Sequence, residues 1–159
     1  MRRLIQASAA SAVAFFLLCS FLLSPAQAWF GGGKFTKVKP EQGMISLPME
    51  DISDGKAHYY RAESDKGVMV KFFVVKSHDG VIRAAVDACD VCYRSGKGYV
   101  QEGSVMVCTN CGMRFATDRI NEVKGGCNPA PLTREVRDGR LMIPMSEINA
   151  NAWLCEFKK

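Results

Sequence analysis

The chain has 159 residues, a formal net charge of +5 and 48% hydrophobic residues. A chain of this size can build one core of its own and has little need of disulfide staples. Its lysines and arginines are spread out without a basic block, which argues against nucleic-acid binding, since that function requires a clustered basic surface.

The N-terminus has the three parts of a secretory signal peptide. Arg2 and Arg3 precede an apolar run over residues 12–23, and the small-x-small pattern that ends at Ala28 suits signal peptidase. We therefore predict a signal peptide over residues 1–28 and an exported, periplasmic protein. The apolar run is shorter than the roughly 20 residues of a membrane span. An uncleaved segment that anchors the protein to the inner membrane is the alternative.

Beyond the leader, the pattern predicts a flexible, glycine-rich linker over residues 29–43 and one domain over residues 44–159. Strands are expected at residues 44–47, 57–62, 68–76, 81–88 and 105–107, then a hairpin over 134–143 and a short helix over 146–152 capped by Ser146. Many short strands with frequent turns indicate a mainly β domain of short antiparallel strands.

Two Cys-x-x-Cys motifs stand out within this domain. Cys89-Asp-Val-Cys92 is separated by fifteen residues from Cys108-Thr-Asn-Cys111, and Gly112 follows the second motif directly. Two intervening residues allow a tight turn to aim both sulfurs at one point, and two such turns supply the four corners of a tetrahedral thiolate site. Gly112 suits the left-handed backbone that closes such a turn. The spacing therefore predicts a metal or iron–sulfur site at Cys89, Cys92, Cys108 and Cys111.

Three readings of these four cysteines remain open. Iron, alone or in an iron–sulfur cluster, would support redox chemistry, whereas zinc would make the site a structural zinc ribbon in a binding module. The third reading is a periplasmic thiol–disulfide oxidoreductase, although such enzymes place their motif in βαβ units and this chain is rich in strands. A plain disulfide scaffold is disfavoured, because bonds within these motifs would close only very small loops.

Cys127 and Cys155 complete the set of six cysteines that follow the leader. Cys127 is an additional metal-ligand candidate, either as a replacement ligand or as a thiol beside the ligands. The default expectation is a disulfide between Cys127 and Cys155, which would fasten the C-terminal segment to the core.

No hydrolase constellation, phosphate-binding glycine loop or haem attachment motif is present, and no small-molecule substrate is evident. An electron-transfer or metal-binding protein is therefore expected in preference to a classical enzyme.

At these motifs the chain resembles the FtrD-like membrane iron–sulfur family of bacterial Ftr-type iron uptake. The similarity rests on the segments around the two motifs, on Gly98-Tyr99 and on Gly125-Gly-Cys127-Asn-Pro-Ala-Pro-Leu132. This resemblance implies electron transfer or iron handling beside a membrane permease or redox partner of an iron-uptake system. The paired motifs and the proline-rich segment are also similar, more weakly, to Rieske domains.

Overall fold

The computed structural model describes residues 33–156. The predicted signal peptide, with its cleavage site and its alternative as an anchor, lies outside the described residues. Among residues 33–156, no helix combines the length and the apolar character that a membrane crossing needs.

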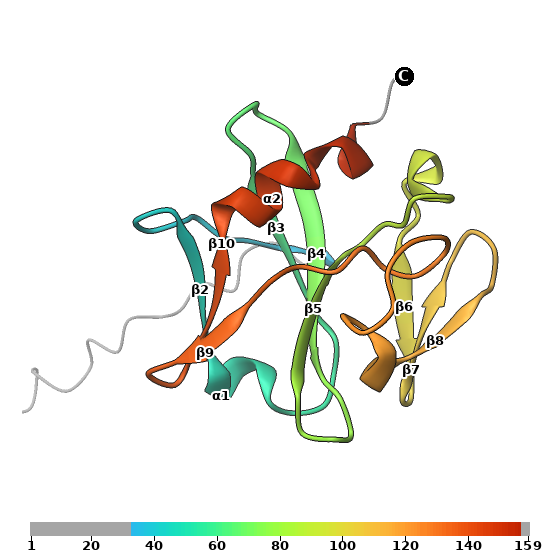
Figure 1. Cartoon of the computed structure of the whole chain (residues 1–159), viewed down its shortest axis with the longest axis horizontal. Coiled ribbons are helices and arrows are strands. Elements are labelled where there is room, and N and C mark those ends of the chain that lie inside the picture. Colours follow the sequence, from blue (N-terminus) through green and yellow to red (C-terminus); the bar gives the residue numbers. More distant parts are fainter. Residues whose placement is uncertain (1–32, 157–159) are drawn as a thin grey trace, which may run out of the picture. The chain divides into compact units, whose positions relative to one another are not determined.

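Short strands dominate the described chain (Figure 1). They are β1 (Thr36–Lys37), β2 (Met44–Pro48), β3 (His58–Glu63), β4 (Met69–Lys76), β5 (Ile82–Val86), β6 (Tyr99–Glu102), β7 (Val105–Cys108), β8 (Arg114–Ala116), β9 (Glu135–Arg137) and β10 (Arg140–Pro144). The helices are α1 (Met49–Ile52) and α2 (Met145–Ala150), with 3-10 helices η2 (Tyr93–Ser95), η3 (Thr117–Arg119) and η4 (Ala152–Cys155). The predicted mainly β class is confirmed.

The strands form three small sheets. The largest has the order β1-β3-β4-β5, and the other two have the orders β2-β10-β9 and β6-β7-β8. Pairing is antiparallel throughout these sheets except between β1 and β3. Figure 1 shows β4 and β5 between the sheet of β2, β9 and β10 on one side and the sheet of β6, β7 and β8 on the other.

Strand β4 is buried on both faces and contributes to two separate cores. Val70, Phe72 and Val74 belong to the first core, whereas Phe73 and Val75 belong to the second. This division follows from the alternation of side chains along a strand. The first core also takes residues from β2, β10 and α2, and the second takes residues from β6 and β7 together with cysteines. The cysteines therefore sit against the second core.

The five strands and the hairpin predicted from the sequence are confirmed to within two residues. Strand β6 was not predicted, because its sequence Tyr-Val-Gln-Glu is short and partly polar. The predicted cap at Ser146 is wrong: α2 begins at Met145, Pro144 stands at the N-cap, and no side chain caps the helix.

The segment predicted as a flexible linker is described from residue 33 onward. There, Thr36 and Lys37 form β1, in register with Tyr60 and Arg61 of β3, and the amide of Val38 donates to the Arg61 carbonyl at 2.9 Å. This part of the segment is thus a strand on the edge of the largest sheet.

Candidate metal centre

The first cysteine turn follows directly from a fully buried strand. All five residues of β5 are buried, and the chain leaves the sheet at Cys89, which is 1% exposed. The backbone amide of Cys92 donates to the Cys89 Sγ at 3.2 Å, and the amide of Tyr93 donates to the Cys89 carbonyl at 3.0 Å. The turn thus presents both sulfurs on one side, as the two-residue spacing predicts.

The second turn follows from β7 in the same way. Cys108 is the last residue of β7, and its amide donates to the Met113 carbonyl at 2.9 Å. The amide of Gly112 donates to the Cys108 carbonyl at 2.8 Å, and Gly112 has a φ of 76°. A residue with a Cβ would be strained there, so the glycine after Cys111 has the role that the sequence predicts.

A third segment brings Cys127 to the same place. The residues that follow Cys127 run alongside β5: the amide of Ala130 donates to the Ala88 carbonyl at 3.0 Å, and the amide of Leu132 donates to the Ala84 carbonyl at 3.0 Å. Pro131 forms an isolated antiparallel bridge with Ala85. Because Cys89 comes just after β5, a chain that pairs with this strand places Cys127 beside it.

The sulfurs of these three segments converge. The Sγ atoms of Cys89, Cys92 and Cys127 lie within 4.8 Å of one another, and so do those of Cys92, Cys108 and Cys111. Cys92 belongs to both groups and thereby links the two Cys-x-x-Cys motifs, whereas Cys89 is grouped with Cys127 and not with Cys108 and Cys111. Cys89 and Cys108 are buried, whereas Cys111 is exposed at the edge of the cluster.

This donor set fits a thiolate-bound metal. A tetrahedral ion with metal–sulfur bonds of about 2.3 Å separates its sulfurs by roughly 3.8 Å. The three sulfurs of each group lie within 4.8 Å of one another, which is compatible with that separation. Thiolates are the ligands that zinc and iron–sulfur clusters prefer.

Crowding also alters the acidity of the thiols. A hydrogen bond from Asn110 lowers the pKa of Cys92, but desolvation and the sulfurs of Cys111 and Cys108 outweigh it and raise this pKa to about 12. The Met113 amide lowers the pKa of Cys111, with help from Cys108. Neighbouring thiols cannot all ionise without a compensating cation. A bound metal ion supplies that charge and deprotonates its ligands.

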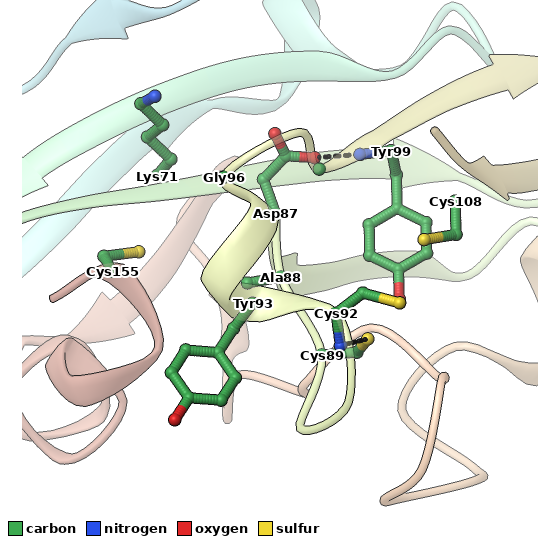
Figure 2. A pocket seen from close by; sticks show the side chains of 11 residues that line it. Lys71, Asp87, Ala88, Cys89, Cys92, Tyr93, Gly96, Tyr99, Cys108 and Cys155 are labelled. Atoms are coloured by element: carbon green, nitrogen blue, oxygen red, sulfur yellow. Dashed lines mark hydrogen bonds between the residues drawn. The ribbon is translucent and has the colours of Figure 1, made fainter. Parts of the chain in front are cut away.

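Tyr99 lies beside the sulfurs and connects two of the cysteine segments. Its side chain points from β6 toward Cys89, Cys92 and Cys108 (Figure 2), and its hydroxyl donates to the Cys127 carbonyl at 2.6 Å. Desolvation is the main cause that raises the pKa of Tyr99, followed by its contact with Cys89. Tyr99 therefore stays a neutral donor in this site. The sequence carries no signal for its role beyond its place next to Gly98.

A buried carboxylate supports Tyr99 from the other end. Asp87, whose side chain is 3% exposed, accepts the Tyr99 amide at 2.8 Å (Figure 2). Desolvation raises the pKa of Asp87 to about 6, and the nearby charge of Lys34 opposes that rise. A Cβ on Gly98 would collide with the Asp87 carboxylate, so any other residue at this position would force the carboxylate to move.

Cys155 belongs to neither group of sulfurs. It lines the same small pocket as Cys89, Cys92 and Cys108, but Figure 2 shows it apart from their sulfurs, on the side of Lys71. The predicted disulfide between Cys127 and Cys155 is wrong, because both thiols are free in the structure. The cause is the pairing of the chain after Cys127 with β5, which places Cys127 at the sulfur cluster instead.

Comparisons with known proteins give one family. Residues 52–154 match the family model described as "Membrane iron-sulfur containing protein FtrD-like". No curated protein matches the chain. Two solved structures of the quaternary ammonium Rieske monooxygenase CntA are similar: the complex with inhibitor MMV12 (17% identity, TM-score 0.44) and the apo form (18% identity, TM-score 0.42). Each similarity covers 63% of this chain but only 30% and 32% of the respective monooxygenase chains.

Proposed function

Because the chain belongs to the FtrD-like family of membrane iron–sulfur containing proteins, we propose that it binds iron and acts in electron transfer or iron handling for a membrane iron-uptake system. Cys89, Cys92, Cys108 and Cys111 would hold an iron–sulfur cluster or a single iron, with Cys127 as a fifth donor. The observation that carries this proposal is that thiols from three segments form two groups, each within 4.8 Å, which share Cys92.

The burial of the thiols suits a redox role. Iron held by thiolates supplies one-electron chemistry at a potential that burial and hydrogen bonds to sulfur adjust. Cys89 and Cys108 lie in the second core, and Cys92 Sγ accepts a hydrogen bond from Asn110 at 3.4 Å. Cys111 is exposed, and Met113 beside it is 53% exposed, so one edge of the centre lies open to a partner.

We propose that the protein acts in the periplasm, beside the inner membrane. The signal-peptide pattern of residues 1–28 supports export to the periplasm, with an uncleaved anchor in the inner membrane as the alternative. The family name, which includes the word membrane, supports a permease or a redox partner of the uptake system as the protein's partner.

A structural zinc site is the second candidate function. Sulfur atoms within 4.8 Å suit a single tetrahedral ion as well as they suit a cluster, and zinc is bound by four thiolates in many structural sites. Zinc would stabilise the fold without a redox step.

Metal and sulfide analysis of the full chain, purified without air, separates these functions. We expect the purified protein to contain iron, to show a thiolate-to-iron absorption band, and to give an EPR signal in one oxidation state. Zinc in place of iron would overturn the redox role and favour the structural site. A metal-free protein whose thiols titrate in whole Cys-x-x-Cys pairs would instead favour a thiol–disulfide oxidoreductase.

A further inference from the structure

One lysine from the N-terminal segment contacts both Tyr99 and Asp87. The Nζ of Lys34 donates to the Tyr99 carbonyl at 2.7 Å and to Asp87 Oδ2 at 3.2 Å. It also lies 4.0 Å from the ring centroid of Tyr59, whose hydroxyl donates to the same Tyr99 carbonyl at 3.2 Å. Two thirds of the Lys34 side chain is covered, since it is 33% exposed.

A carboxylate, a carbonyl and an aromatic ring together hold this ammonium group in place. Aromatic faces attract cations, and a carboxylate and a carbonyl provide charged and neutral acceptors. The ring of Phe35 packs edge-on against Tyr59 at 5.8 Å and lies 5.1 Å from Lys34 Nζ. The edge strand β1 then holds this segment to the sheet.

The contacts continue from Lys34 through Tyr99 to the backbone of Cys127. Asp87 accepts the amide of Tyr99, Lys34 donates to the carbonyl of Tyr99, and the hydroxyl of Tyr99 donates to the carbonyl of Cys127. Both backbone groups of Tyr99 are thus held by side chains, which fixes the ring that supports the Cys127 loop. Asp87 also lies two residues before Cys89.

We propose that Lys34 is a positioning residue of the metal centre: it fastens the segment of residues 33–38 against Tyr99 and thereby holds the Cys127 loop at the sulfur cluster. Its positive charge also offsets the buried Asp87 carboxylate next to an anionic thiolate site. This inference rests on the proposed function for the metal, but its effect on Cys127 precedes metal binding. The part of the chain that joins the predicted leader to the domain is therefore a component of the centre.

A matched control lies three residues further on. Lys37 belongs to the same segment and forms an ion pair with Glu63 at 3.5 Å, but both side chains are about half exposed and neither contacts Tyr99 or Asp87. Exposed pairs of this kind contribute little to stability. Lys37→Met removes the same charge from the same segment, keeps an unbranched side chain of similar length, and leaves the proposed contacts in place.

The test uses the full chain with Lys34→Met, Lys34→Gln, Lys34→Arg and Lys37→Met. In reduced, metal-free protein, the alkylation of each cysteine by iodoacetamide is followed by mass spectrometry. We expect Lys34→Met to raise the rate at Cys127 relative to Cys111 by about fivefold, the factor for one hydrogen bond. Lys34→Gln keeps a hydrogen-bond donor and replaces Lys34→Met in the comparison if the methionine variant unfolds. Lys34→Arg keeps the charge and the donors, so Cys127 should be alkylated in it almost as slowly as in the unaltered protein.

In metal-loaded protein, the reduction potential provides a second readout. Removal of a nearby positive charge disfavours the more negative, reduced state. Lys34→Met and Lys34→Gln should therefore lower the potential, whereas Lys37→Met should leave it near that of the unaltered protein. Equal behaviour of the Lys34 and Lys37 variants in both measurements would overturn the proposal. If the unaltered protein binds no redox metal, the proposed function fails, and the alkylation rates still decide the role of Lys34.

Discussion

The hydroxyl of Tyr99 donates a 2.6 Å hydrogen bond to the carbonyl of Cys127, across 28 positions of the chain. This bond joins the start of β6 to the loop that carries the fifth thiol. It lies beside the buried sulfurs, where an unpaired carbonyl is costly. The bond thus links the packing of the second core to the geometry of the candidate centre.

Replacement of Tyr99 by phenylalanine tests this link. Tyr99→Phe keeps the ring but leaves the Cys127 carbonyl without its donor, at a cost of about 1–3 kcal/mol in the free energy of unfolding. We expect lower stability in urea and faster alkylation of Cys127. Tyr59→Phe is the control, because it removes a neighbouring hydroxyl that contacts the Tyr99 carbonyl and not the Cys127 carbonyl. Equal effects of the two substitutions would contradict the specific role of Tyr99.

Gly98 and Gly103 allow the effect of the Asp87 carboxylate, which lies close to Gly98, to be separated from backbone strain. Both have positive φ, 69° and 59°, but only at Gly98 does an added Cβ meet another group, the Asp87 carboxylate. Gly103→Ala should cost about 1–2 kcal/mol through backbone strain alone. Gly98→Ala should cost about 1–3 kcal/mol more, because the carboxylate must move. Urea unfolding measures the loss of stability in both variants. Equal losses would contradict the expected clash between the new Cβ and the Asp87 carboxylate.

The ion pairs of a buried arginine make the stability of the fold depend on pH. Arg83, whose side chain is 5% exposed, contacts Asp79 at 2.7 Å and Glu122 at 2.9 Å. Hydrogen bonds from the Ser77 hydroxyl and the Val81 amide, and then Arg83, hold the pKa of Asp79 well below its ordinary value.

A carboxyl whose pKa is lower in the folded state stabilises the fold above its unfolded pKa, near 4, and this stability disappears as the pH falls through the folded pKa. We therefore expect Asp79→Asn to lower stability at pH 7 and to weaken the acid dependence below about pH 4. Denaturant unfolding between pH 2 and pH 7 checks this, and parallel pH profiles of the two proteins would contradict it.

The two cysteines outside the paired motifs should behave differently on substitution. Cys127 lies within 4.8 Å of Cys89 and Cys92, whereas Cys155 belongs to neither sulfur group. Loss of a group that only supports a metal ligand typically weakens metal affinity by about tenfold or more. We therefore expect Cys127→Ser to weaken metal affinity by at least about tenfold. Cys155→Ser should leave affinity unchanged. Competition with a chromophoric chelator measures both, and equal affinities in the two variants would remove Cys127 from the donor set.

Local patterns in the sequence predict much of this molecule. Alternation and turn residues locate β4 and the hairpin at Asp138, and the two-residue spacing predicts the paired sulfurs of Cys89 and Cys92. The place of Cys127 depends on long-range pairing of its segment with β5, which no local spacing encodes. The contact of Lys34 with Asp87 spans 53 positions of the chain, so local sequence patterns do not predict it either.

We propose that five thiols, in two groups joined by Cys92, bind metal and that the sixth, Cys155, does not. Differential alkylation tests it most directly: each cysteine is labelled in the metal-loaded chain and again after the metal is removed under reducing conditions. We expect metal to protect Cys89, Cys92, Cys108, Cys111 and Cys127 and to leave the rate at Cys155 unchanged. Protection of Cys155, or equal labelling of the paired cysteines with and without metal, would contradict the account.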